Sequence, residues 1–301
     1  MSAVACIGEC MVELSLPREA GGPARVGFAG DTANVAIYLK REAPQVEVAY
    51  VTAVGTDALS EGMVAFLAGH DLDTALIERR PDRAPGLYAI SLDAAGERSF
   101  TYWRDSSAAR TLFVAPCVVT PESLAGFGLI YLSGITLAVM TPEARADLRV
   151  FLAAHRARGG SVSFDSNYRP RLWPDAETAR AEMAAFWRLT DVGLPSIDDE
   201  AALWGDTDAG ATLARLAGFG VASGALKRGA EGPLAIGWDG TLPAFPFVKP
   251  VDTTAAGDSF NGGYLAARIA GAAPPDCLAA GHALASRVVL HPGAIMPAAE
   301  R

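Results

Sequence analysis

The stretch Asp252-Thr253-Thr254-Ala255-Ala256-Gly257-Asp258-Ser259-Phe260-Asn261-Gly262-Gly263 decides how this chain is interpreted. It is a polar turn that leads into the apolar run 264–269. If that run is helical, the backbone N–H groups of Ala256 and Gly257 lie at its positive end, where an anion binds favourably. Small side chains let a phosphate approach the backbone, and Asp258 offers a carboxylate that can accept a hydroxyl proton. The stretch predicts phosphoryl transfer to an alcohol. Alone, a Gly-Asp pair would predict only a helix N-terminus with a dipole-complementing carboxylate.

Composition limits the class of protein. The 301 residues suffice for one large α/β domain or two smaller ones with a substantial core. No uncharged apolar run approaches the roughly 20 residues that span a bilayer. Residues 1–9 lack a basic segment before their apolar part, so they predict a first strand and not a signal peptide. A net charge of −9 argues against general nucleic-acid binding.

Cysteine and histidine are scattered along the chain. Neither residue type has the spacing of a zinc site or of a disulfide framework. We therefore expect reduced cysteines in a cytoplasmic protein. A local basic cluster is interpreted as the solvated face of a helix; its members are Arg145, Arg149, Arg156 and Arg158.

Strand-like and helix-like segments alternate along most of the chain. This alternation predicts a mostly parallel sheet with helices on both faces. The expected strands are 4–8, 46–54, 129–133, 161–165, 192–194, 221–226 and 234–238, and the expected helices are 32–41, 59–68, 142–158, 176–189, 261–270 and 275–290.

Two insertions break this alternation. One, at about 11–29, holds short apolar pieces around a turn-rich segment. The other, at about 86–105, has two period-2 strands joined by Ala94-Ala95-Gly96-Glu97, which predicts a hairpin. We expect the two insertions to form a small β-sheet lid on a single domain that covers residues 1–301.

Residues 252–258 resemble the second signature of the ribokinase-like (PfkB) carbohydrate kinases, whose common form is D-T-x-G-A-G-D. Ala255 stands where the family usually has Gly, so the backbone φ at this position is in question. The Ala-Ala-Gly-Asp version is similar to that of 2-keto-3-deoxygluconate kinases. The resemblance implies a ribokinase-like fold, ATP and Mg²⁺, an anion hole at 255–258 and Asp258 as base and substrate ligand.

A second matching segment lies near the N-terminus. Residues 27–36 resemble the family's G-G-x-x-x-N-x-A pattern, with Ala29 in place of the first Gly. The resemblance implies that Gly30 and Asn34 contact substrate hydroxyls. Taken alone, Asp31 or Thr32 would be interpreted as an N-cap.

The predicted lid carries side chains suited to a sugar acid. Tyr102 and Arg104, two residues apart, are expected on one strand face, with Tyr88 on the other strand. An arginine can hold a carboxylate bidentately, and a tyrosine can bond a hydroxyl. Strand propensity alone would explain such aromatic residues. Resemblance to 2-keto-3-deoxygluconate kinases favours substrate binding by all three.

Residues 164–173 follow a predicted strand, where ligands bind in parallel sheets. Their D-x-N-x-R-x-x-L-W pattern is common to several sugar kinases of the family. The resemblance implies that Asp165 and Asn167 face the transfer site. It also places Arg169 near the substrate and the phosphates.

The nucleotide side is inferred from resemblance too. Residues 195–200 resemble the N-x-x-E segment that organises Mg²⁺, with Ser196 in place of Asn and Asp199 in place of Glu. An acidic first helical turn also has a structural explanation. Lys227, Gly229 and Gly232 match the K-x-G-x-x-G turn along ATP phosphates. His282 is a candidate neighbour of adenine, and a helix-buried histidine is the alternative.

These expectations combine into an ATP-dependent kinase acting on the terminal hydroxyl of 2-keto-3-deoxygluconate. A fructokinase or ribokinase for a neutral sugar is the first alternative, and a catalytically inactive sugar-binding protein the second. The tyrosines and two arginines favour the acid. A homo-oligomer formed through the lid is expected. The gluconate or galactonate epimer stays open.

Overall fold

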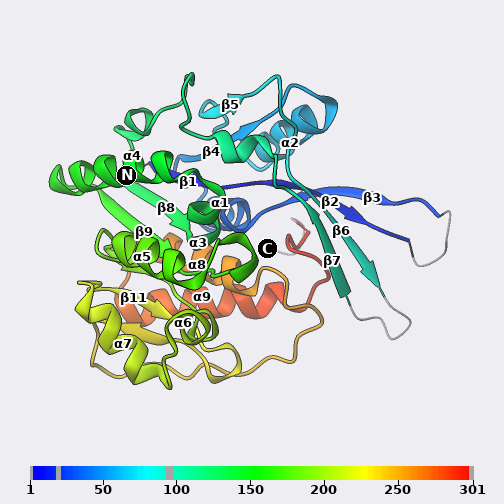
Figure 1. Ribbon diagram of the computed structural model, residues 1–301. Coiled ribbons are helices and arrows are strands. Elements are labelled where there is room, and N and C mark those ends of the chain that lie inside the picture. The colour runs from blue at the N-terminus through cyan, green and yellow to red at the C-terminus, as the bar shows by residue number, and fades with distance from the viewer. Residues whose placement is uncertain (1–2, 18–21, 93–97, 298–301) are drawn as a thin grey trace.

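The computed structural model describes residues 3–17, 22–92 and 98–297. Its main sheet has eight strands in the order β12-β11-β10-β9-β8-β1-β4-β5 (Figure 1). All neighbouring strands pair in parallel except β11 and β12. The strands are β1 (Val4–Ile7), β4 (Val48–Val54), β5 (Ile77–Arg79), β8 (Leu129–Ser133), β9 (Ser161–Asp165), β10 (Val192–Gly193), β11 (Gly224–Leu226) and β12 (Leu234–Ile236).

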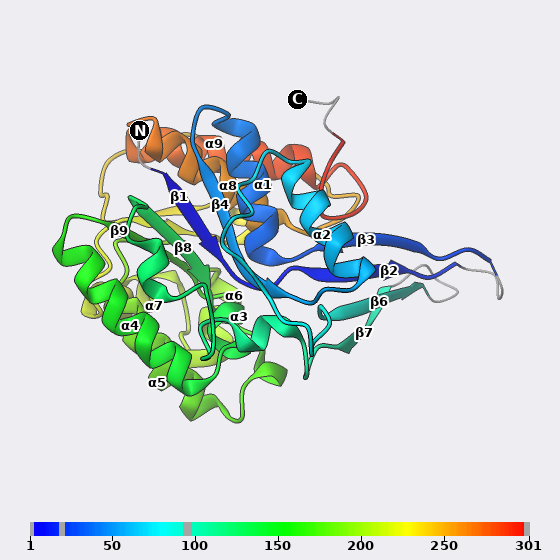
Figure 2. The same cartoon turned by 90° about the horizontal axis from the view of Figure 1, so that it is seen from above.

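Helices cover both faces of this sheet, as Figure 2 shows from above. Every residue of β1 is buried, because its side chains point alternately to the two faces of the sheet and each face has a hydrophobic core. Val4 and Cys6 belong to the first core, and Ala5 and Ile7 belong to the second. The first core is covered by α1 (Asp31–Glu42), α2 (Ala58–Ala68), α8 (Ala256–Ile269) and α9 (Pro274–Val288). The second is covered by α3 (Gly134–Val139), α4 (Pro142–Ala157), α5 (Ala176–Trp187), α6 (Ile197–Trp204) and α7 (Ala209–Gly218). The predicted mostly parallel α/β architecture is confirmed.

A smaller four-stranded sheet extends from one end of the main sheet (Figure 1). Its order is β3-β2-β6-β7, with β2 (Met11–Ser15), β3 (Arg25–Ala29), β6 (Leu87–Leu92) and β7 (Arg98–Trp103). The two predicted insertions thus pair with each other, through parallel β2 and β6. The turn predicted at residues 94–97 lies outside the described residues.

Some element boundaries differ from the predicted ones. Helix α8 begins at Ala256, five residues before the predicted start, because small residues after the turn already have helical geometry. Strand β11 begins at Gly224, where φ is +139°, and not at 221. The short elements α3, α7 and β5 were not predicted, since too few residues reveal their periodicity.

The interpretation of the basic cluster as a solvated face is wrong for three of its four members. Arg145 is only 6% exposed; it donates to the carbonyls of Leu137 and Met140 and lies over the Trp173 ring. Arg149 pairs with Glu182 at 2.6 Å, and Arg156 pairs with Asp191. These cations connect α4 to α5 and to the start of β10, and Arg158 alone is exposed. None of the described helices has the length and apolar character needed to cross a membrane.

Candidate active site

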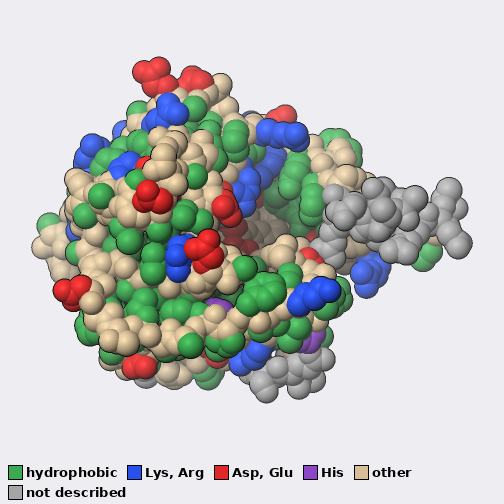
Figure 3. All heavy atoms as spheres, turned by 90° about the horizontal axis from the view of Figure 1, so that it is seen from below, with side chains coloured by type: hydrophobic (Ala, Val, Ile, Leu, Met, Phe, Trp, Pro, Cys, Tyr) green, Lys and Arg blue, Asp and Glu red, His purple; other side chains and the backbone are tan. Residues whose placement is uncertain are grey.

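A cleft of about 670 Å³ opens at the carboxyl ends of the main-sheet strands, beside the small sheet. Figure 3 shows the hollow on this face of the molecule. Segments far apart in sequence meet here because parallel strands place their following loops at one edge. Of the predicted site residues, the cleft is lined by Tyr102, Asp165, Asn167, Arg169, Ser196, Asp199, Lys227, Gly229, Ala255, Ala256, Gly257, Asp258 and His282.

The N-terminus of α8 forms one wall of the cleft. Its N-cap, Ala255, adopts the left-handed conformation with φ 59° and ψ 17°. This answers the question raised by alanine at this position: the fold keeps the positive φ and accepts the strain. The N–H of Ala256 donates to the Thr253 carbonyl at 3.1 Å, so this predicted donor is occupied. Within the described part of the chain, no acceptor is bonded to the N–H groups of Gly257 and Asp258. The free donors therefore begin one residue later than predicted.

Asp258 projects from the first turn of α8 into the cleft. Its Oδ2 accepts from Asn34 Nδ2 at 2.8 Å, so a residue of α1 orients the carboxylate. The pKa of Asp258 is raised to about 7: burial is the largest cause, the negative charge of Asp31 adds to it, and the Asn34 hydrogen bond acts in the opposite direction. A carboxyl with a pKa near neutrality is suited to accept a proton at physiological pH.

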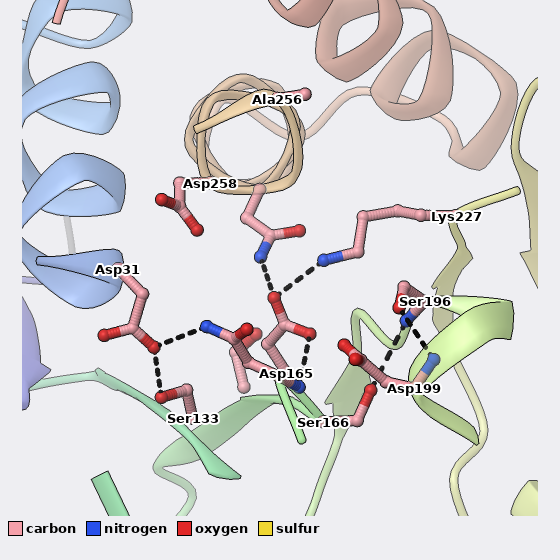
Figure 4. Close-up of polar contacts among 12 residues, drawn as sticks. Asp31, Ser133, Asp165, Ser166, Ser196, Asp199, Lys227, Ala256 and Asp258 are labelled. Carbon is pink, nitrogen blue, oxygen red and sulfur yellow. Dashed lines mark hydrogen bonds and ion pairs between the residues drawn. The ribbon is translucent and has the colours of Figure 1, made fainter. Parts of the chain in front are cut away.

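Two more carboxylates face the same space (Figure 4). Asp31 Oδ2 accepts from Ser133 Oγ at 2.5 Å and from Asn167 Nδ2 at 2.7 Å. The N-cap expectation for Asp31 is wrong: the N-cap is Gly30, and Asp31 is the first helical residue. The hydroxyl of Thr32 is likewise no cap, since it is buried and bonds Tyr50.

Asp165 is the partner of the cleft's lysine. Its Oδ2 receives hydrogen bonds from Lys227 Nζ and from Asn261 Nδ2, both at 2.7 Å. Lys227 also approaches the start of α8, since a Cβ built on Gly257 would lie 3.5 Å from its Nζ. The lysine therefore adds positive charge beside the free N–H groups of α8, where an anion would lie.

The predicted substrate residues of the small sheet are not all in the cleft lining. Tyr102 is half exposed and lines it. Tyr88 pairs with Tyr102 across the strands and donates its hydroxyl to Glu13. Arg104 lies beyond the end of β7, and its guanidinium is paired with buried Glu9.

Glu9 was not identified from the sequence, because a single acid after a predicted strand gives no signal. The same residue explains Gly30: a Cβ there would lie 2.2 Å from the Glu9 carbonyl oxygen. Gly30 is therefore required for the close approach of α1 to the chain leaving β1. It lies outside the lining of the cleft, as do Asn34, Tyr88 and Arg104.

On the opposite wall, Ser196 is the N-cap of α6 and accepts from the N–H of Asp199. Burial raises the pKa of Asp199, and the nearby Arg169 lowers it in part. Arg169 Nη1 lies 3.1 Å from Asp199 Oδ1. The acidic first turn of α6 therefore has a structural role, in addition to any role in ligand binding. Arg169 is half exposed and lines the cleft, and its Nε and Nη2 have no hydrogen-bond partner among the residues that the structure describes.

Three predicted nucleotide-side residues remain. Gly229 and His282 line the cleft, and Gly232 lies outside its lining. Gly229 has φ +52° and lines the cleft. Gly232 has φ +75° and packs against Phe245, since a Cβ there would lie 2.8 Å from the Phe245 Cβ. His282 lines the cleft on α9 and packs against the same ring, with Nε2 3.0 Å from the Pro246 carbonyl oxygen. His282 is half-buried, so it is neither a fully buried helix histidine nor a fully exposed neighbour for adenine.

No group of three or more His, Cys, Asp or Glu side chains able to hold a metal ion occurs among residues 3–17, 22–92 and 98–297. A site with few protein ligands still fits Mg²⁺, which keeps several waters and binds through one or two carboxylates plus phosphate oxygens. Asp199 lies on the cleft wall and offers one such carboxylate.

Comparison with known proteins agrees with this geometry. The model of the pfkB family carbohydrate kinases matches residues 1–301, and the chain belongs to this family. The chain is 43% identical to a 2-dehydro-3-deoxygluconokinase of Escherichia coli (strain K12), over 98% of this chain and 97% of that protein. It is 44% identical to a protein of the same name from Dickeya dadantii (strain 3937), over 98% and 96%. A crystal structure of a PfkB protein from Polaromonas sp. JS666 superposes with a TM-score of 0.84 at 26% identity, covering 96% of each chain.

Proposed function

We propose that this chain is an ATP-dependent 2-keto-3-deoxygluconate kinase, that is, a 2-dehydro-3-deoxygluconokinase. One observation carries the proposal: the carboxylate of Asp258 and the free N–H groups of α8 face one cleft. The names of the relatives at 43% and 44% identity over nearly the whole chain support the choice of substrate.

In this mechanism Asp258 accepts the proton of the substrate's terminal hydroxyl. The oxygen then attacks the γ-phosphorus of ATP in line, the bond from that phosphorus to the β-phosphate oxygen breaks, and ADP leaves. The N–H groups of Gly257 and Asp258 stabilise the negative charge on the transferring group. Lys227 adds a positive charge at the same end of α8.

The nucleotide would lie along the wall formed by Ser196, Lys227, Gly229 and His282. This wall joins a helix N-terminus to small and apolar side chains, which suits phosphates at one end and a base at the other. Asp199 would hold Mg²⁺, and the bound ion would supply positive charge to the phosphates of ATP. Asn167 would lie between the two substrates, and it donates a hydrogen bond to Asp31 Oδ2.

The sugar acid would lie between Asp258 and the small sheet, which we propose acts as a lid. Tyr102 and Arg169, which line the cleft, would contact a hydroxyl and the carboxylate. Gly30, Asn34, Tyr88 and Arg104 lie outside the lining, so they would contact the substrate only when the small sheet closes. Tyr88 and Arg104 would then exchange their bonds to Glu13 and Glu9 for bonds to the substrate. Val26 and Trp103 are 56% and 59% exposed on the other face of the small sheet. We propose that this apolar face joins two copies of the chain, and that the enzyme works in the cytoplasm.

A coupled ADP-release assay with 2-keto-3-deoxygluconate, fructose and ribose tests the function. The keto-acid should give a kcat/KM at least roughly 10²-fold above either neutral sugar, since a charge-assisted carboxylate pair contributes a few kcal/mol. Preference for fructose or ribose would make the chain a neutral-sugar kinase. Binding of a sugar without ADP formation would make it a sugar-binding protein.

A further inference from the structure

Asn261 is a fully buried polar residue in the second turn of α8, 0% exposed to solvent. It follows Gly257 by four residues, so the two lie on the same face of the helix. Its Nδ2 donates to the Tyr131 hydroxyl at 3.1 Å and to Asp165 Oδ2 at 2.7 Å. A carboxylate only accepts hydrogen bonds, so Asp165 determines which end of the amide faces it.

The other end of this amide is unsatisfied. Asn261 Oδ1 is buried and has no hydrogen-bond partner within the described part of the chain. Most buried polar groups are paired, and an unpaired one destabilises the folded state. Leucine, which has a similar size, would avoid this cost. Packing alone therefore does not explain an asparagine at this position, and its donor end carries the partners that matter.

Asp165 passes this constraint on to Lys227 (Figure 4). Lys227 Nζ donates to the same Oδ2 at 2.7 Å, and the two side chains are 12% and 4% exposed. The backbone of Lys227 is held by Pro195 and Ile197, but its four-carbon stem is flexible. Asp165 therefore determines where the positive charge lies. It is the one acceptor bonded to Nζ among the described residues, so two N–H groups of the ammonium are left for a ligand.

We propose that Asn261 is a positioning residue for phosphoryl transfer: through Asp165 it holds the Lys227 ammonium beside the first turn of α8, against the transferring phosphoryl group. The inference rests on the proposed function, in which this group lies at the free N–H groups of Gly257 and Asp258. Helix α8 thus supplies these donors and, one turn later, the amide that fixes the nearby positive charge. A group misplaced by about 1 Å can lower the rate by roughly 10²-fold, so a shift of Asp165 should be visible in kcat.

The test is a double-mutant cycle on kcat with Asn261→Leu, Lys227→Met and the double variant. Lys227→Met should lower kcat by roughly 10²-fold, as expected when a group that stabilises transition-state charge is lost. Asn261→Leu should lower kcat by roughly 10-fold and change KM for the keto-acid by less than about twofold. In the Lys227→Met background the same change should lower kcat by less than about twofold, because no ammonium remains to be positioned.

Binding of a transition-state mimic keeps the test valid if Asn261→Leu folds poorly. ADP with aluminium fluoride and Mg²⁺ mimics the transferring phosphoryl group. The ratio of its Kd to the Kd of ADP with Mg²⁺ alone does not depend on the fraction of folded enzyme. This ratio should rise by roughly 10-fold in Asn261→Leu, and it should not rise further when Asn261→Leu is added to Lys227→Met.

Tyr131→Phe is the matched control. It removes the other partner of Asn261 Nδ2 and leaves the bond to Asp165, so kcat should stay within about twofold of the wild type. Asp147→Asn, on the exposed face of α4, is the surface control and should keep the wild-type kcat.

An equal loss of kcat from Asn261→Leu with and without Lys227 would overturn the inference and leave Asn261 a structural role. A wild-type kcat in Asn261→Leu, or an equal loss in Tyr131→Phe, would also overturn it while the proposed function stands. A wild-type protein that released no ADP with the keto-acid or with a neutral sugar would instead remove the proposed function, and this inference with it.

Discussion

The guanidinium of Arg104 and the carboxylate of Glu9 form a buried ion pair that joins the end of the small sheet to the chain leaving β1. Arg104 Nε donates to Glu9 Oε2 at 2.9 Å, Nη2 donates to the same oxygen, and the two side chains are 10% and 0% exposed. Glu9 Oε1 has no hydrogen-bond partner within the described residues. An arginine expected to bind the substrate carboxylate is therefore already neutralised in this structure.

Replacing Arg104 should have two separate effects, one on substrate binding and one on stability. Arg104→Ala should raise KM for the keto-acid far more than KM for ATP. It should also destabilise the fold by roughly 3–5 kcal/mol, because Glu9 is left buried and unpaired. Steady-state kinetics with each substrate varied, together with thermal unfolding, measures both effects. Equal changes in the two KM values would contradict a carboxylate-binding role for Arg104.

The double variant Glu9→Gln/Arg104→Ala separates the two effects. A neutral amide at position 9 should restore much of the stability lost in Arg104→Ala, because no buried charge remains unpaired. KM for the keto-acid should remain high. If it returned to the wild-type value, the loss in Arg104→Ala would be due to destabilisation and not to a lost contact.

Asp258→Asn tests the base. The amide keeps the size of the side chain but cannot accept the proton, so kcat should fall by roughly 10²–10⁴-fold. The Kd for ATP, measured by calorimetry, should change little. Turnover at the wild-type rate would exclude Asp258 as the base.

The same variant predicts a pH-dependent gain in stability. The folded pKa of Asp258 is raised to about 7 from the ordinary 3.8, so its contribution to stability is fully present below the unfolded value and is lost as pH rises through 7. Removing the charge should therefore raise the melting temperature above neutral pH, by roughly 2–4 °C for each kcal/mol gained, and should have little effect near the unfolded pKa. Unfolding scans of both proteins at about pH 5 and pH 8.5 make the comparison. A gain that did not grow with pH would contradict the raised pKa.

The charge of Asp31 should set the pH at which kcat/KM falls on the acidic side of the pH profile. Since its charge raises the pKa of Asp258, Asp31→Asn should move the acid limb of the kcat/KM profile from near pH 7 to lower pH. Asp147→Asn serves as the surface control. A limb that stays in place would show that the two carboxylates do not interact in solution.

Ala255→Gly tests the strain at the start of α8. Alanine at φ 59° destabilises the folded state by roughly 1–2 kcal/mol, and glycine would remove this cost. Glycine also makes the unfolded chain more flexible, which lowers stability by less than about 1 kcal/mol. The free energy of unfolding should rise by roughly 0.5–1 kcal/mol. The matched control, Ala256→Gly, lies at the first helical position and should not stabilise. Denaturant titrations give both values, and destabilisation by Ala255→Gly would contradict a strained turn.

Local sequence determined much of this protein. Short apolar runs separated by amphipathic segments were enough to predict the parallel sheet, because the length of a run, its residue types and its flanking turn residues distinguish such strands from helices. The turn at 252–258 predicted an anion site and an adjacent carboxylate, because helix polarity follows from chain direction. Asn34 and Asp258, 224 residues apart, came from separate motifs, and their hydrogen bond was not foreseen.

Only the tertiary structure decided which side chains are neighbours. The pairing of Arg104 with Glu9, the occupation of the Ala256 N–H by Thr253 and the meeting of Asp31 with Asp258 depend on how separate loops converge at one sheet edge. The acidic residue at position 31 appeared in the sequence as a possible cap, and the fold placed it in the cleft. Propensity and period act over a few residues, whereas a pKa or an ion pair depends on groups brought together from distant parts of the chain.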